Sequence, residues 1–143
     1  MNTFLTVKNM LRREAYSCVI ADRDRVMTSR ARGIAPLLER AERGELLEGA
    51  FVADRIIGKA AAMLLVPMRV AAVYGEVMSR EAERLLLENG IKVDCGALTD
   101  RIDNRAGDGP CPMEQAVADL TDCAAAPAAL RARLRALSER ASQ

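Results

Sequence analysis

Histidine is the residue type whose absence is most informative, because the 143-residue chain contains none. Without an imidazole, Ser–His and Cys–His nucleophile pairs, histidine general bases and histidine-containing metal sites are all excluded. Tryptophan is also absent and aromatic residues make up only 3% of the chain, so a base-stacking platform for single-stranded nucleic acid is not expected. The net charge is +1, which favours neither nucleic acid nor a membrane as a partner.

Long apolar runs and paired cysteines are missing too. The longest uncharged run, from Ala60 to Met68, is far too short to cross a bilayer, and no signal segment opens the chain. We therefore expect a cytoplasmic protein whose four cysteines, at positions 18, 95, 111 and 123, are reduced. No two of them form a C-x-x-C pair, so neither a zinc ribbon nor a thioredoxin-type redox site is expected.

The overall composition is typical of a globular protein. Half of them are hydrophobic and 29% are charged, and the length is sufficient for one domain with its own core. We expect a single domain over residues 1–143, with a C-terminal helix at about 126–140 as an appended element.

Hydrophobic periodicity and turn residues predict alternating helices and strands. The expected elements are a helix over 2–14, a hairpin of strands 16–21 and 26–28, a helix over 34–41, a helix over 55–65, a strand over 70–74, a helix from 79 to about 89, a strand over 91–93, a helix from 112 and the last helix. Strand–helix–strand passages imply parallel pairing, and the hairpin implies an antiparallel edge. The predicted fold class is therefore α/β, a three-layer sandwich with a mixed sheet flanked by helices.

The helix expected after Phe51-Val52-Ala53-Asp54 is central to this prediction. Gly58 and the alanines that follow it would let neighbouring backbone come close, and Pro67 would end the helix. Asp54 would lie at the start of this helix, where backbone N–H groups lack helical partners. We expect that end to face a functional pocket.

This succession resembles the cytidine deaminase-like fold, whose enzymes carry H-x-E and P-C-x-x-C at the starts of two helices. Val52-Ala53-Asp54 matches the place of the first motif and Glu76-Val77-Met78-Ser79-Arg80-Glu81 the place of the second. In this match Val52, Met78 and Glu81 replace the zinc ligands, and Asp54 replaces the catalytic Glu. The resemblance therefore implies a deaminase fold without zinc, with no metal site and no other cofactor.

The whole chain is more similar still to an uncharacterised prokaryotic domain-of-unknown-function family on that same fold, which lacks the zinc ligands. The matching stretches are 29–38, 52–54 with 58–62, 74–79, and 104–105 with 109–114. The resemblance implies a fold and a common origin and gives no substrate.

Asp54 and Ser79 are the main candidate site residues, and each has two interpretations. Either can be a helix N-cap that accepts a hydrogen bond from a free backbone N–H. Alternatively, Asp54 can be a ligand-binding or catalytic carboxylate, and Ser79 can bind an oxyanion with the N–H groups of its helix. We expect both helix starts to converge on one pocket, together with Val52, Ala53, Met78 and Glu81.

The remaining candidates lie in loops. Arg30 and Arg32 precede a helix start and can bind phosphate or be solvated. Asn104 and Arg105 lie in a glycine-containing loop that can close over a ligand. Cys111 precedes Pro112 at a helix start, where it can be a reactive thiol or an inert one.

Three functions remain open at this point. The first is a zinc-free deaminase-fold protein that binds a nucleotide or nucleotide-derived small molecule without deaminating it. The second is a metal-independent enzyme or acceptor of nucleotide or ADP-ribose-type chemistry centred on Asp54. The third is an oligomeric interaction module, since deaminase-like folds commonly self-associate, and a homodimer is our default expectation.

Overall fold

The structure is a computed structural model that describes residues 3–141. A single mixed sheet forms its centre, with strand order β2–β1–β3–β4–β5. β1 is antiparallel to both β2 and β3, whereas β3, β4 and β5 run parallel to one another. The strands are β1 (Cys18–Asp22), β2 (Arg25–Ser29), β3 (Phe51–Ile57), β4 (Ala72–Ser79) and β5 (Lys92–Thr99). The predicted mixed sheet and its antiparallel hairpin edge are thereby confirmed.

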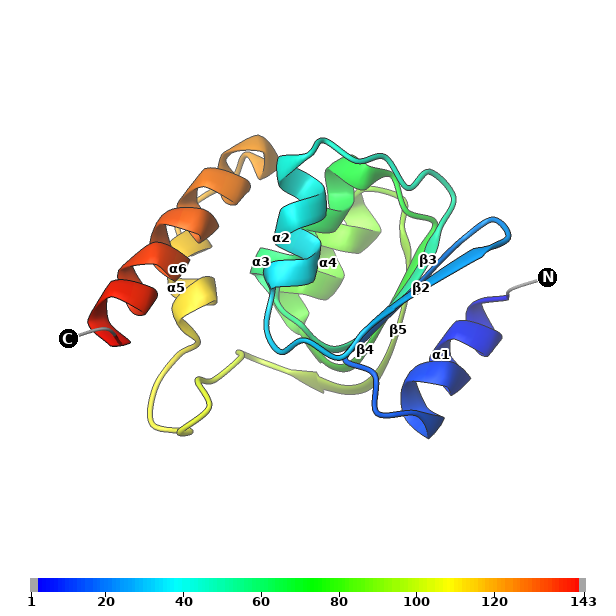
Figure 1. The fold of residues 1–143 in the computed structure, drawn as a ribbon, viewed down its shortest axis with the longest axis horizontal. Coiled ribbons are helices and arrows are strands. Elements are labelled where there is room, and N and C mark those ends of the chain that lie inside the picture. The colour runs from blue at the N-terminus through cyan, green and yellow to red at the C-terminus, as the bar shows by residue number, and fades with distance from the viewer. Residues whose placement is uncertain (1–2, 142–143) are drawn as a thin grey trace.

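Helices cover both faces of the sheet. Figure 1 shows α1 on one side, α2, α3 and α4 on the other, and α5 and α6 beyond them. The helices are α1 (Phe4–Arg13), α2 (Ala35–Glu42), α3 (Lys59–Leu65), α4 (Arg80–Glu88), α5 (Pro112–Val117) and α6 (Ala126–Ala141), with short 3₁₀ turns η1 (Val66–Met68) and η2 (Cys123–Ala125). No helix between residues 3 and 141 is long and apolar enough to span a membrane.

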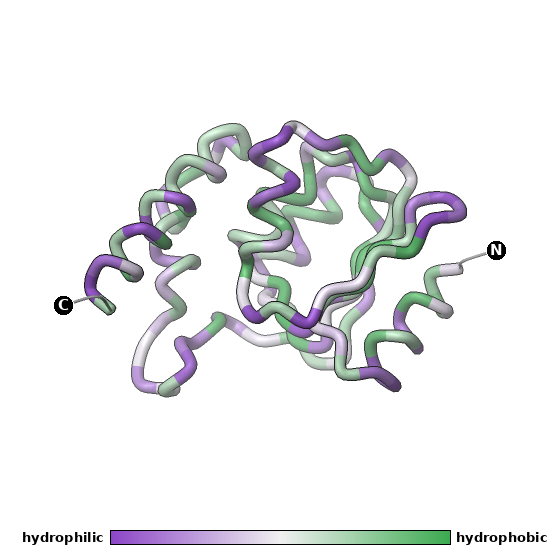
Figure 2. The backbone as a smooth tube through the Cα atoms, viewed as in Figure 1, coloured by the Kyte–Doolittle hydropathy of each residue, from purple (hydrophilic) through white to green (hydrophobic). Residues whose placement is uncertain are grey.

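Two apolar layers hold these elements together. Val7 and Leu11 of α1 are fully buried against the face of the sheet that carries Val19 and Ala53. The larger layer lies between the opposite face of the sheet and the remaining helices. Figure 2 shows hydrophobic stretches, in green, along the strands and along the helices next to the sheet. Amphipathic periodicity predicted α1 within a residue or two, although the expected start at Asn2 lies outside the described residues.

The prediction of a helix over 55–65, opening at Asp54, is wrong for residues 55–58. Residues 51–57 form β3, Asp54 lies in the middle of that strand, and α3 begins only at Lys59, with Gly58 as its N-cap. β3 pairs with β1 on one side and β4 on the other. Pairing on both sides favours the extended conformation over the helix that Asp54 and Arg55 suggest. A strand can contain Arg55 because its side chain finds partners on α1 and β4.

Arg55 joins β3 to the end of α1. Its guanidinium donates to the carbonyl oxygens of Leu11 at 2.6 Å, Glu14 at 2.9 Å and Tyr16 at 2.8 Å, and forms an ion pair with Glu76 of β4 at 2.6 Å. It thus satisfies carbonyl groups at the end of α1, which lack helical partners, and one in the connection to β1.

The other predicted elements are confirmed with shifted ends: β1 and β4 each begin two residues later than predicted, and β2, β4 and β5 extend further. β4 continues past the predicted end at Tyr74 to Ser79, and β5 past Val93 to Thr99, because the two strands pair along their whole length up to Ser79 and Thr99. α4 begins after Ser79 and α5 at Pro112, as the capping residue and proline predicted.

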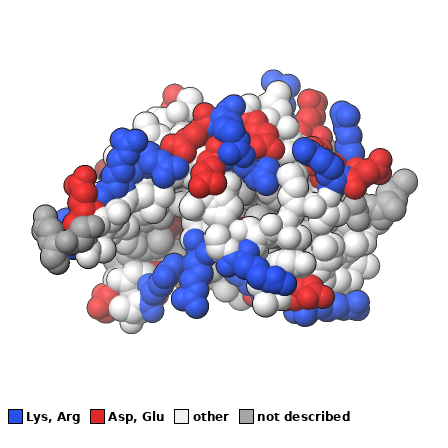
Figure 3. All heavy atoms as spheres, in the orientation of Figure 1, with Lys and Arg blue, Asp and Glu red and all other residues white. Residues whose placement is uncertain are grey.

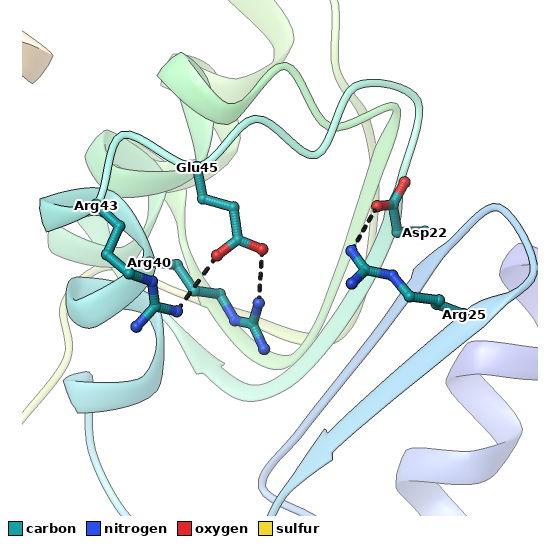
Figure 4. A network of polar contacts seen from close by, with 5 residues as sticks. All are labelled: Asp22, Arg25, Arg40, Arg43 and Glu45. Atoms are coloured by element: carbon teal, nitrogen blue, oxygen red, sulfur yellow. Dashed lines mark hydrogen bonds and ion pairs between the residues drawn. The ribbon is translucent and has the colours of Figure 1, made fainter.

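Charged side chains fix the connections around the hairpin and α2. Figure 4 shows Arg40 and Arg43 converging on Glu45, at 2.8 and 3.3 Å, where the chain leaves α2 for β3. In the hairpin, Arg25 pairs with Asp22 at 3.1 Å across the predicted turn. In the face drawn in Figure 3 both signs of charge are interspersed along the upper part, whereas lysine and arginine side chains predominate along the lower part.

Candidate functional site

The candidate site lies where the three parallel strands end. Since β3, β4 and β5 are parallel, their carboxyl ends meet at one edge of the sheet, the usual place for a ligand in open α/β sheets. A pocket of about 300 Å³ lies there, which we call the strand-end pocket. Its lining comes from the starts of α3 and α4, the segment after β5, and α5; the polar and charged members are Lys59, Ser79, Glu81, Asp100, Arg101, Glu114 and Gln115.

Ser79 is the N-cap of α4. Its Oγ accepts a hydrogen bond from the Ala82 amide at 3.1 Å, and the residue is only 2% exposed. The capping interpretation is therefore confirmed, and the side chain also lies in the pocket wall. Glu81 follows in the first turn of the same helix, where a carboxylate interacts favourably with the helix dipole.

Lys59 is a largely buried cation in the pocket and lies at the start of α3. Its ammonium donates to the Ala118 carbonyl at 3.0 Å and lies 3.4 Å from a Glu81 carboxylate oxygen, and its side chain is 12% exposed. A single side chain thus connects α3, α4 and the end of α5.

Glu114, like Lys59 and Gln115, is a residue of the site that the sequence did not indicate. One carboxylate oxygen accepts from the Lys59 amide at 2.8 Å and the other from the Ala60 amide at 2.7 Å. Burial raises the pKa of Glu114, as does the nearby charge of Glu81, although the two amides and Lys59 oppose the rise. The pairing spans more than fifty residues, so no local capping pattern could indicate it.

Gly58 makes room for that carboxylate. A Cβ at this position would lie 2.2 Å from the nearer Glu114 oxygen, a distance that nonbonded atoms do not tolerate. Its φ is −101°, which any residue adopts, so the glycine provides space and not an unusual backbone conformation. The small residue that predicted close backbone packing is in fact packed against a carboxylate from α5.

Asp54 lies apart from the strand-end pocket and is not among its lining residues. It is partly buried in the middle of β3, opposite Cys18 of β1 and Gly75 of β4. Burial raises its pKa to about 7, although hydrogen bonds from the Ile56 amide and the Cys18 thiol lower it in part. Burial, and then the charge of Asp54, raise the pKa of the Cys18 thiol well above its usual value.

The structure therefore does not bring Asp54 and Ser79 together as the sequence match predicted. Val52, Ala53 and Met78 are fully buried in the apolar layers, so they offer no surface to a ligand. Of the second predicted group, Ser79 and Glu81 line the pocket. The convergence of two helix starts is present, but it involves α3 and α4 through Lys59 and Ser79.

The loop candidates lie in separate places. Arg30 is exposed before α2 and stacks its guanidinium 4.5 Å from the centre of the Tyr16 ring, and Arg32 is exposed two residues later. Arg105 is exposed at the turn between β5 and α5, where the Asn104 side chain bonds Asp108.

Cys111 is the residue immediately before α5, as predicted, but its side chain makes no capping hydrogen bond. Among residues 3–141 no group of three His, Cys, Asp or Glu side chains lies close enough to hold a metal ion.

Comparison with known proteins identifies the family. The family model described as a domain of unknown function, DUF1893, matches residues 6–134. The crystal structure of a DUF1893 family protein from Thermotoga maritima is similar, with a TM-score of 0.74 and 26% identity, over 89% of this chain and 84% of that one. No match was found among curated proteins. The chain therefore belongs to the DUF1893 family.

Proposed function

We propose that the protein binds a nucleoside or another nucleotide-derived small molecule in the strand-end pocket and does not deaminate it. The observation that carries this proposal is the position of the pocket, at the carboxyl ends of three parallel strands and at the starts of two helices. Its volume of about 300 Å³ is at the lower end for small-molecule sites, which favours a ligand of nucleoside size over a dinucleotide.

The sheet topology supports a cytidine deaminase-like fold as part of the proposal. The hairpin is followed by a helix, a buried strand and a second helix, which are α2, β3 and α3. On this topology the H-x-E and P-C-x-x-C positions fall at the starts of α2 and α3, near Gly33–Ala35 and Gly58–Ala60. That is one helix earlier than the match to Val52-Ala53-Asp54 and 76–81.

The residues at the starts of α2 and α3 do not fit a catalytic zinc ion. Zinc needs three protein ligands, in most cases imidazole, thiolate or carboxylate. Gly33, Ile34 and Ala35 at one helix start and Gly58, Lys59 and Ala60 at the other supply none of these groups. We propose instead that the Glu114 carboxylate fills the space at the start of α3, and no chemical step is assigned to a metal.

The charges in the pocket favour an uncharged part of a nucleotide. Among the described residues, both cations of the lining already have carboxylate partners: Lys59 with Glu81 at 3.4 Å and Arg101 with Asp103 at 2.9 Å. A triphosphate would have to displace these pairs. A base or sugar could use the Glu81 carboxylate and the Gln115 amide, both of which are exposed, as hydrogen-bonding partners.

A thermal-shift panel of nucleosides, nucleotides and nucleotide-sugars tests this function. Binding increases the free energy of unfolding by mass action, by about 2.7 kcal/mol at a ligand concentration 100-fold above Kd. This stabilisation raises the melting temperature. We expect a shift of several degrees with at least one nucleoside, reduced in Glu81→Gln and retained in Glu83→Gln, which changes the same helix turn outside the pocket. The absence of a shift with every compound would contradict the proposal.

A second candidate is chemistry centred on Asp54, which its pKa of about 7 favours, because a general base works best with a pKa near the operating pH. Incubation with labelled nucleotide, compared between the unmodified protein and Asp54→Asn, tests it. Loss of turnover or labelling in the variant would support this role, and equal activity would remove Asp54 from any mechanism.

A further inference from the structure

One wall of the strand-end pocket is formed by the segment that follows β5, the last strand of the sheet. Residues 100–118, which we call the lid, run from the end of β5 through an exposed loop to α5. Pro110, Glu114, Gln115 and Ala118 of the lid face the starts of α3 and α4 across the pocket. Access to the pocket therefore depends on how firmly the lid is held.

The two ends of the lid helix are held differently. Val117, at the end of α5, is fully buried in the apolar layer, whereas near the start of α5 Met113 is only partly buried against that layer and the other contacts are polar. Glu114 accepts from two amides of α3, and Arg133 of α6 donates to the Pro112 carbonyl at 3.1 Å. At the start of α5 the polar contact with α3 is thus one carboxylate on two N–H groups, while at the other end of the helix the Lys59 ammonium donates to the Ala118 carbonyl at 3.0 Å.

This contact is suited to opening and closing. The Lys59 and Ala60 amides are the first in α3 and have no partner within the helix, so water can replace Glu114 without disturbing a helical hydrogen bond. Burial of the Glu114 charge opposes the favourable hydrogen bonds. Gly58 permits this contact, because a Cβ at position 58 would occupy the space of the Glu114 carboxylate.

We infer that residues 100–118 form a lid over the strand-end pocket and that the Glu114 carboxylate is the latch holding it shut on α3. This inference rests on the proposed function, since a lid matters only if the pocket admits a ligand. Opening breaks the two amide–carboxylate bonds and pivots the first turn of α5 and the loop before it about the buried Val117.

Amide hydrogen exchange of the free protein, measured by NMR at neutral pH, tests the latch. In Glu114→Gln one of the two amides loses its acceptor, and in Gly58→Ala the new Cβ displaces the carboxylate. We expect exchange of the Lys59 and Ala60 amides, and of the Gln115 amide within α5, to accelerate at least about tenfold in both variants, with the amides of β3 and β4 unchanged.

Glu83→Gln is the matched control, because it removes a carboxylate of the first turn of α4 that neither lines the pocket nor bonds the α3 amides. Unchanged exchange in both latch variants would overturn the inference. An equal acceleration throughout the sheet would do so too, since it would show that α5 opens only when the whole protein unfolds. Because the measurement uses no ligand, its failure would leave the thermal-shift test of binding intact, and failed binding would leave the latch result standing.

Discussion

Asp54 is a carboxyl group that the fold keeps partly buried, with an amide and a thiol as its hydrogen-bond partners. Its pKa in the folded protein, about 7, is above the ordinary 3.8. A group with a raised folded pKa contributes stability that is fully present at low pH and is lost as the pH rises through the folded pKa. The charge on Asp54 at pH 8 therefore works against folding.

Replacing Asp54 by Asn should remove that pH dependence. We expect the free energy of unfolding of the variant, relative to the unmodified protein, to increase steadily between pH 4 and pH 7 and to level off above. The upper limit is about 4 kcal/mol, at about 1.36 kcal/mol per pKa unit. Urea denaturation across this range measures it.

Asp94→Asn is the control, because Lys8 lowers the pKa of Asp94. Its contribution is present above the ordinary pKa and is lost only as the pH falls through the lower folded value, so its effect should not change between pH 5 and pH 7. A flat difference for Asp54→Asn over the range from pH 4 to pH 7 would contradict the burial of this carboxyl group.

At the scale of elements, α4 illustrates what sequence can predict. Ser79 at its start and Gly90 after its end are local signals, and the structure uses Ser79 as a cap and Gly90 at a φ of 76°. The boundary between β3 and α3 is the opposite case. Asp54 and Arg55 resemble a helix start, but their partners are Cys18 of β1, the end of α1 and Glu76 of β4, which no local pattern reveals.

The cap of α4 gives an element-scale prediction. Ser79→Ala leaves the Ala82 amide without its acceptor in a buried setting, and we expect a loss of about 1–2 kcal/mol in the free energy of unfolding. Ser79→Thr keeps the hydroxyl and should lose less. Chemical denaturation of both variants measures the difference; equal stability of the alanine variant and the unmodified protein would show that the cap contributes nothing.

At the scale of the whole molecule, the parallel strands determine which residues share a site. The sequence indicated the mixed sheet and the cap at Ser79, because capping residues and buried runs are local signals. It could not place Glu114 on the start of α3, since that contact depends on how α5 folds back after β5. Nor could it place Lys59 in the site, because the helix expected over 55–65 is in fact the end of β3 followed by α3.

Self-association remains a prediction at this scale. We expect a homodimer of about 31 kDa, twice the 15.5 kDa chain mass, in light scattering at several protein concentrations. Exposed apolar side chains on several elements, Leu5, Leu46, Ile56 and Leu87 among them, are available for such contacts. A monomer at every concentration would contradict this expectation.

The most direct test of ligand binding at the sheet edge is an NMR titration of the labelled protein with cytidine, uridine, adenosine and guanosine, each added separately. We predict saturable shifts of the Lys59, Glu81 and Gln115 amide signals with at least one nucleoside, weakened in Glu81→Gln and unchanged in Glu83→Gln. If none of the four gives a saturable shift, or if the shifts gather around Cys18 and Asp54, the strand-end pocket is not the binding site.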